Sequence, residues 1–171
     1  EFFSTKIIEE YKEALDAGIQ TKPVLIGPVT FLLLGKEKES GFDKIDLIEK
    51  LLPVYNEVIS KLIELGVEYI QFDEPCLSLN LTEKEKEALR YTYEKINRSF
   101  PSLKIFLANY FDCFGENLET VLQLPVHTLH LDLVRCSSEL DKILDSKFLN
   151  PTTNLSLGLV NGRNIWKNNF E

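Results

Sequence analysis

The segment "VEYIQFDEPCL", at residues 67–77, joins a short apolar run to two adjacent carboxylates and a proline. Its β-branched and aromatic side chains are typical of a buried strand. Pro75 lacks a backbone N–H, so regular strand pairing should end beside it. We therefore expect Asp73 and Glu74 at the carboxyl end of a strand, where they serve either chemistry or structure.

Four further segments read as strands, and helix-like segments lie between them. We expect strands in "KPVLIGPVTFLLL" (22–34), "LKIFLANY" (103–110), "VHTLHLDLV" (126–134) and "LSLGLV" (155–160). We expect helices at residues 4–18, 43–66, 82–100, 117–124 and 137–146. Strands that are apolar nearly throughout and alternate with helices indicate a parallel sheet covered by helices.

The predicted helices carry local start and stop signals. Asp43 can cap the second helix, and Thr82 with Glu85 forms a capping box at the start of the third. Pro53 should kink the second helix or divide it, because the proline ring displaces the carbonyl of Glu49.

Two parallel α/β architectures fit this order of elements: an open doubly wound sheet and a closed (β/α)8 TIM-type barrel. The open sheet is favoured by a glycine-rich phosphate loop, but the eight glycines are scattered and form no such motif. The barrel needs about 250 residues. We therefore expect an incomplete barrel segment, with about five parallel strands, as one domain segment over residues 1–171. A first residue other than Met and a helix-like final segment indicate a piece of a longer protein.

Composition argues against several classes of partner. The net charge is −8 and no basic stripe occurs, so binding to nucleic acid is not expected. The longest uncharged apolar stretch, residues 23–35, is shorter than the roughly 20 residues that span a bilayer. We expect a cytoplasmic protein with no membrane partner. Its three cysteines, Cys76, Cys113 and Cys136, are predicted to be reduced thiols rather than a disulfide framework.

The carboxyl ends of the strands are the expected ligand-binding face of a parallel α/β fold. Each predicted strand ends in hydrogen-bonding groups. Because loops are polar in any protein, these groups could also be ordinary loop residues without a binding role. These groups are Thr30, Asp73, Glu74, Asn109, Tyr110, Asp112, His130, Asp132, Arg135, Asn161, Gly162, Arg163 and Asn164. The candidate substrate-binding residues at this mouth are Asp73, Glu74, Asp132, Asn161 and Arg163, and no residue is assigned a catalytic role.

Asp73 and Glu74 are poorly placed to act as a catalytic pair. Successive residues of a strand face opposite ways, so only one of them can point into the mouth. A general acid–base pair needs two carboxyls that converge on one substrate. We expect one carboxylate to lie at the mouth and the other to tie down a loop or helix.

A zinc site built on His127 and His130 is not expected either. Spaced by three on a strand, the two rings should face opposite sides, which prevents a shared metal with Cys113, Cys136 or Asp132. No C-x-x-C, H-x-C or H-E-x-x-H motif occurs. The sequence therefore predicts no metal site in this segment.

Five stretches together resemble one family. They are "KPVLIGPVTFLLLGK", "LLPVYNEV", "VEYIQFDEPCLSLNL", "LPVHTLHLDLVR" and "LGLVNGRNIWKN". In this order they resemble the amino-terminal half of cobalamin-independent methionine synthase. The resemblance implies a two-barrel enzyme that transfers a methyl group from 5-methyltetrahydropteroyltri-L-glutamate to L-homocysteine, forming L-methionine. It also implies zinc in the carboxyl-terminal barrel, no cobalamin, and a metal-free amino-terminal barrel that supports the fold and the folate tail.

The resemblance extends to individual residues. Asp73 matches the Asp of a "DEP" motif that engages the amino-acid substrate in the family's catalytic half. Asn109, Tyr110 and Phe111 stand where that half carries its zinc-binding H-x-C, and Asp132 aligns with a carboxylate ligand. The resemblance therefore implies that "DEP" is a structural relic in this segment. An aliphatic run also replaces an aromatic residue expected near the folate.

Two other interpretations remain open at this point. The chain could be a stand-alone barrel enzyme of the uroporphyrinogen-decarboxylase-like type, which would use the carboxylates at the mouth. It could also be a non-catalytic scaffold domain. For the methionine synthase interpretation, the expected partners are the two small-molecule substrates and the carboxyl-terminal barrel.

Overall fold

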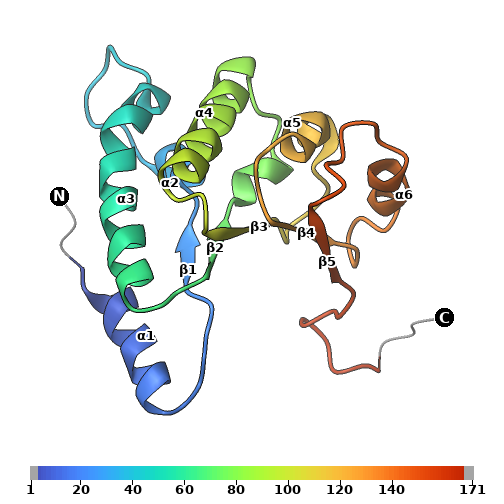
Figure 1. The fold of residues 1–171 in the computed structure, drawn as a ribbon. Coiled ribbons are helices and arrows are strands. Elements are labelled where there is room, and N and C mark those ends of the chain that lie inside the picture. Colours follow the sequence, from blue (N-terminus) through green and yellow to red (C-terminus); the bar gives the residue numbers. More distant parts are fainter. Residues whose placement is uncertain (1–3, 168–171) are drawn as a thin grey trace.

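The computed structural model describes residues 4–167 and contains a five-stranded parallel sheet with the order β1-β2-β3-β4-β5 (Figure 1). The strands are β1 (Val24–Ile26), β2 (Tyr69–Asp73), β3 (Lys104–Ala108), β4 (Thr128–Asp132) and β5 (Asn154–Gly158). The helices are α1 (Lys6–Asp16), α2 (Pro28–Leu34), α3 (Ile48–Glu64), α4 (Glu83–Ser99), α5 (Leu118–Leu122) and α6 (Glu139–Leu144). Short 3-10 turns occupy Lys44–Leu47, Pro75–Ser78 and Gly115–Asn117.

The strand order confirms the predicted fold class. Each new strand pairs with the one before it, and all four pairings are parallel. A doubly wound sheet would reverse its order at a switch point, whereas a barrel adds strands in one direction. The five strands and their helices therefore form part of a (β/α) barrel.

The two faces of the sheet differ in chemistry. Helices α2 to α6 follow one face, as the ribbon in Figure 1 shows, and the strand residues beneath them are apolar and buried. These residues are Ile70, Phe72, Ile105, Leu107, Leu129 and Leu131. Burying each such side chain stabilises the fold by about 1.5–3 kcal/mol. The opposite face carries Gln71, Asp73 and His130, which are half-buried.

The segment expected as one strand at residues 22–34 is a strand followed by a helix. β1 ends at Ile26, Gly27 is the extended N-cap, and α2 begins at Pro28. Proline suits the first helical position because the N–H it lacks would have no helical partner there. The prediction was wrong for the second half of this segment.

Helices α3 and α4 follow their predicted signals closely. The Asp43 side chain accepts a hydrogen bond from the Ile45 amide, and the capping box of Thr82 and Glu85 is formed. Pro53 does not divide α3, which runs without a break from Ile48 to Glu64. Because Pro53 lies near the start of α3, its missing N–H removes only one helical hydrogen bond.

The cysteine prediction was wrong for one pair. Cys113 and Cys136 form a disulfide, with their Cα atoms 5.3 Å apart, while Cys76 is free and buried. The two bonded residues follow β3 and β4, which are neighbours in the sheet, so their loops meet at the same edge. The sequence did not indicate this pairing, because the number of cysteines is odd and the two residues lie 23 positions apart.

No helix within residues 4–167 combines the length and apolar character that crossing a bilayer would require.

Candidate functional site

A cavity of about 120 Å³ lies at the carboxyl ends of β4 and β5. It is lined by Tyr110, His130, Asp132, Val134, Arg135, Gly158, Val160, Asn161, Gly162 and Arg163, and we call it the mouth pocket. Three of the five predicted substrate-binding residues, Asp132, Asn161 and Arg163, therefore lie together. Tyr110, His130 and Arg135 were recognised as strand-end groups but were not chosen as candidates.

Asp132 and Arg135 form the charged centre of the mouth pocket. The buried Asp132 carboxylate accepts a hydrogen bond from the Arg135 amide at 3.2 Å and pairs with the guanidinium group. The same guanidinium donates to the backbone carbonyl of Tyr110 at 3.3 Å. These contacts fix a cation at the carboxyl end of β4.

His130 lines the mouth pocket from strand β4. Its Nδ1 lies 3.0 Å from the Ser156 hydroxyl oxygen, and its ring stacks on Phe106. Burial lowers the pKa of His130, although the nearby Asp132 acts in the opposite direction. Burial likewise lowers the pKa of Lys22, whose ammonium group lies 3.3 Å from the centre of the Phe106 ring.

Asp73 lies beside the mouth pocket rather than in its lining. One carboxylate oxygen accepts a hydrogen bond from the Gln71 amide at 2.6 Å, and the other accepts one from the Tyr110 hydroxyl at 2.9 Å. Burial and the Asp73 hydrogen bond raise the pKa of Tyr110 to about 12. Tyr110 therefore stays protonated and connects Asp73 to the pocket.

Glu74 was also proposed at the mouth, and the structure places it on the opposite face of the sheet. Its carboxylate accepts hydrogen bonds from the α2 amides of Thr30 at 2.8 Å and Val29 at 3.3 Å. The Tyr93 hydroxyl donates a third hydrogen bond at 3.1 Å. Burial raises the pKa of Glu74, since the side chain is fully enclosed. The strand alternation explains the correction: Asp73 faces the mouth side and Glu74 ties down α2.

The residues that match the family's zinc motif do not fit a zinc ion. The side-chain oxygen Oδ1 of Asn109 accepts from the Ser78 hydroxyl at 2.7 Å, and its side-chain nitrogen Nδ2 donates to the Asp112 backbone carbonyl at 2.9 Å. Tyr110 is a protonated phenol, and Phe111 offers no ligand atom. An amide, a phenol and a phenyl ring are not the thiolate and imidazole ligands that zinc prefers.

The two histidines lie on the same face, contrary to the expectation from their spacing. His127 packs edge-on against Tyr69, and His130 stacks on Phe106 of the same face. His127 precedes the first residue of β4, so the strand alternation does not apply to it. Neither histidine belongs to a group of three metal ligands in the described part of the chain.

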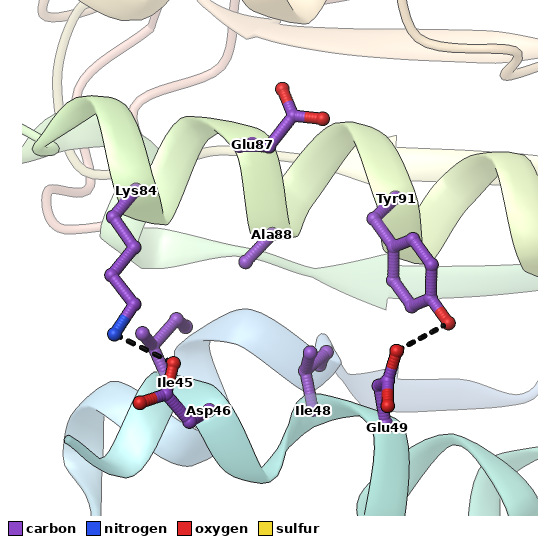
Figure 2. A pocket seen from close by; sticks show the side chains of 8 residues that line it. All are labelled: Ile45, Asp46, Ile48, Glu49, Lys84, Glu87, Ala88 and Tyr91. Carbon is purple, nitrogen blue, oxygen red and sulfur yellow. Dashed lines mark hydrogen bonds and ion pairs between the residues drawn. The ribbon is translucent and has the colours of Figure 1, made fainter. Parts of the chain in front are cut away.

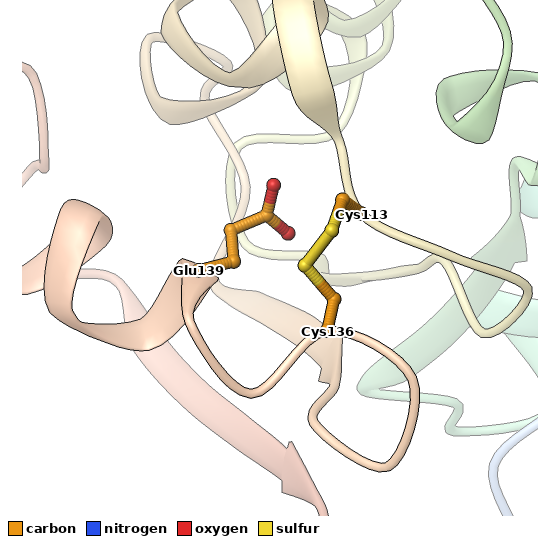
Figure 3. Close-up of side chains that lie close together, drawn as sticks. All are labelled: Cys113, Cys136 and Glu139. Carbon is orange, nitrogen blue, oxygen red and sulfur yellow. A yellow bond between two sulfur atoms is a disulfide. The ribbon is translucent and has the colours of Figure 1, made fainter.

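Three side chains near the mouth pocket were missed by sequence reasoning as a group. Cys113, Cys136 and Glu139 lie close together, as Figure 3 shows; the cysteines are in the loops after β3 and β4, and Glu139 is the first residue of α6. A usable signal existed, because the two cysteines come shortly after strands that are adjacent in a barrel. Glu139 had no comparable signal, since it belongs to the start of α6 rather than to a strand end.

A larger groove of about 390 Å³ lies between the start of α3 and α4 (Figure 2). Lys84 forms an ion pair with Asp46 at 2.6 Å across it, and the Tyr91 hydroxyl donates to Glu49 at 3.2 Å. The groove lies between two helices on the outer side of the sheet. Ligands in this class of fold bind instead inside the mouth formed by the strand ends and their loops. We therefore place the candidate site at the mouth pocket.

The comparisons with known proteins agree along the whole chain. Residues 1–171 match the family described as "Cobalamin-independent synthase, N-terminal domain". A "5-methyltetrahydropteroyltriglutamate--homocysteine methyltransferase" of Flavobacterium johnsoniae is 64% identical over 171 residues, which is 100% of this chain and 22% of that protein. A Cytophaga hutchinsonii protein of the same name is 52% identical over 168 residues, covering 98% of this chain and 22% of the relative.

A third protein with that name, from Bradyrhizobium diazoefficiens, is 45% identical over 167 residues, covering 98% of this chain and 21% of the relative. The chain thus spans about a fifth of the length of these relatives. The parallel strand order, the polar mouth and the sequence matches lead to one conclusion. The chain belongs to the cobalamin-independent synthase family, as a member of its N-terminal domain.

Proposed function

We propose that this chain is the amino-terminal barrel segment of a cytoplasmic methyltransferase. The complete enzyme would transfer the methyl group of 5-methyltetrahydropteroyltri-L-glutamate to L-homocysteine, forming L-methionine without cobalamin. The observation that carries this proposal is the family match over residues 1–171, together with the name of relatives up to 64% identical. The segment itself supports the fold and the binding of the folate tail, and it is inactive alone.

The mouth pocket supports a role in holding the glutamate tail. A triglutamate tail presents several carboxylates, which a guanidinium group binds well through paired hydrogen bonds. Arg163 is exposed, and no ion pair involves it among residues 4–167. The side-chain oxygen Oδ1 of Asn161 accepts a hydrogen bond from the Arg163 backbone amide at 3.1 Å, so the two residues share one ordered turn. Arg163 would bind a tail carboxylate, and the side-chain amide of Asn161 would donate to a second one.

The acidic residues of the site would position the Arg135 guanidinium and the Tyr110 hydroxyl. Asp132 neutralises and orients Arg135, and Asp73 holds the Tyr110 hydroxyl. Within residues 4–167, the hydrogen-bond partners of these two carboxylates are Gln71, Tyr110 and Arg135, and none is a second carboxyl. This arrangement supports substrate binding and positioning rather than catalysis within the segment.

The zinc ion would belong to the carboxyl-terminal barrel, which we propose as the partner of this segment. When bound there, zinc would hold homocysteine as a thiolate and so supply the nucleophile. The residues of this chain that match the zinc motif do not fit the metal, as Asn109 and Tyr110 show. They contribute no ligand to the proposed reaction.

Steady-state kinetics of the complete enzyme test the proposal. Replacing Arg163 with Ala should raise KM for the triglutamate substrate by roughly 10- to 100-fold, the value of one charge-assisted contact. The KM for the corresponding monoglutamate, which lacks most of the tail, should change little. Arg98→Ala is the matched control, since Arg98 pairs with Glu94 on the exposed surface of α4.

Two outcomes separate the competing functions. An equal change of KM for both folates would contradict tail binding by Arg163 and leave the enzyme assignment intact. A complete protein that binds neither folate polyglutamate nor homocysteine in calorimetry would contradict the methyltransferase proposal and support a scaffold domain.

A further inference from the structure

The loops after β3 and β4 and the start of α6 bring together three potential metal ligands that the proposed methyl transfer does not use. Cys113, Cys136 and Glu139 each offer one ligand atom, and these atoms lie within 4.8 Å of one another. Figure 3 shows the Glu139 carboxylate on the same side as the two sulfur atoms. None of the three residues lines the mouth pocket. We call them the thiol–carboxylate cluster.

The backbone holds Glu139 in place. One of its carboxylate oxygens, Oε1, accepts hydrogen bonds from the amides of Phe114 at 2.8 Å and Gly115 at 3.2 Å. The residue as a whole is only 5% exposed. Within the described residues, the two hydrogen bonds go to Oε1, which leaves Oε2 available as a ligand for a cation. A buried carboxylate is stabilised by a partner, and a cation is a strong one.

We propose that the reduced cluster binds one thiophilic divalent cation, such as Zn²⁺, through two thiolates and the Glu139 carboxylate. Zinc takes sulfur ligands at about 2.3 Å and carboxylate oxygens at about 2.0–2.2 Å in a tetrahedral arrangement. Ligand atoms around such an ion lie about 3.5–3.8 Å apart, which the 4.8 Å limit of the cluster accommodates. Two thiolates select soft cations over Mg²⁺ and Ca²⁺.

The disulfide and the metal are alternative states of the same pair. The Cys113–Cys136 bond occupies both sulfurs, so a cation binds only after reduction. A dithiol reductant supplies two electrons and two protons, the S–S bond breaks, and the reductant becomes a disulfide. Metal binding then releases the two thiol protons, because the thiolate is the ligand.

The location of the cluster gives this exchange a structural consequence. Cys136 follows Arg135 directly, and its amide donates to the Asp132 carbonyl at 2.9 Å. Cys113 lies on the loop that carries Tyr110, and it is half-buried, which opens a path for the cation. Either the disulfide or the metal therefore joins the two loops that form one side of the mouth pocket.

Cadmium titration of the complete protein tests the proposal. The protein is reduced with a dithiol, the dithiol is removed, and Cd²⁺ is added while thiolate-to-cadmium absorption and native mass are measured. The reduced wild type should bind one more equivalent than the Cys113→Ser/Cys136→Ser variant, and the oxidised wild type should lack that equivalent. Glu139→Gln should weaken cadmium binding at this additional site by roughly 10- to 100-fold, as changes around a metal centre typically do.

A matched thiol control distinguishes the cluster from general thiol binding. Cys76→Ser removes a buried cysteine on the helical side, beside Glu74, and should leave the additional equivalent unchanged. Equal metal content in the reduced wild type and the double serine variant would overturn the proposal. If the double variant does not fold, as judged by circular dichroism, an equal metal content of the reduced and oxidised wild type would overturn it instead.

Discussion

Glu74 connects two layers of the molecule through one side chain. Its carboxylate lies at the start of α2, where free backbone amides and the helix dipole favour negative charge. Tyr93, from α4, and the Cys76 thiol also donate to this carboxylate. Asp73, its neighbour in the same strand, instead meets Gln71 and Tyr110 on the open face. The adjacent residues Asp73 and Glu74 therefore have different roles: Glu74 fixes the packing of α2, and Asp73 belongs to the surroundings of the mouth pocket.

Glu74→Gln should destabilise the complete protein by about 1–3 kcal/mol, because the new amide group presents its own donors to backbone amides that need an acceptor. Asp73→Asn is the matched variant on the half-buried face and should cost less than about 1 kcal/mol. Denaturant unfolding of both variants beside the wild type measures the difference. Equal losses would show that Glu74 has no special structural role.

The contribution of Glu74 should also depend on pH. Burial raises its pKa in the folded state above the ordinary value of 4.5, so the folded protein binds this proton more tightly than the unfolded chain. The stability gained from proton binding is fully present below pH 4.5 and is lost as pH rises through the raised pKa. The stability difference between wild type and Glu74→Gln should therefore shrink as pH rises, in unfolding curves recorded from pH 5 upward. A difference independent of pH would contradict this assignment.

The sequence predicted the residue-level roles in part. Strand alternation predicted that Asp73 and Glu74 point to opposite faces of the sheet. The positions of the strand ends predicted that Asp132, Asn161 and Arg163 lie close together. It could not say which carboxylate would face the helices. That choice depends on the register with β1, which places Asp73 beside Ile26.

At the scale of elements, the junction between β1 and α2 depends on Gly27. A Cβ atom added there would lie 1.9 Å from the Glu74 carboxyl carbon, well inside van der Waals contact. The missing side chain leaves the space in which the carboxylate reaches the helix start. Glycine at position 27 therefore leaves the room that the buried Glu74 carboxylate occupies.

Gly27→Ala should destabilise the protein by about 1–3 kcal/mol, as overpacking of a buried site does. Gly162→Ala is the control, because a Cβ at Gly162 meets no atom within 4 Å. Chemical unfolding midpoints compare the two variants. A Gly27→Ala protein as stable as the control would mean that Glu74 can move away at little cost.

The elements themselves were predictable where the signal was local. The capping box at Thr82 and the cap at Asp43 need only neighbouring residues, and both formed. Helix α2 was missed because its run of apolar residues has no polar face, so only Pro28 marked its start. The Cys113–Cys136 disulfide was missed because it depends on which strands are adjacent.

At the scale of the whole molecule, the sheet has two outer strands, β1 and β5, and neither has a second neighbour within residues 4–167. Both strands expose apolar side chains. These include Val24, Ile26 and Leu157, which are 48%, 38% and 44% exposed. Open strand edges with apolar neighbours promote association between chains.

The 171-residue chain studied alone should therefore self-associate, whereas the complete protein should remain dispersed. Analytical ultracentrifugation over a range of concentrations measures the association, and calorimetry measures the cooperativity of melting. A monomer with a single cooperative transition would show that these edges need no further strand.

The hydrogen bonds of Glu74 also set an order for synthesis on the ribosome. Glu74 lies 44 positions after Thr30 and 45 positions after Val29 in the sequence. Tyr93 lies a further 19 positions along the chain. A nascent polypeptide that has completed α3 has made the α2 amides but not yet their acceptor. The junction between β1 and α2 is therefore completed only after β2 and Glu74 have emerged from the exit tunnel. A translational pause before that point would leave the start of α2 without its acceptor and exposed to chaperones.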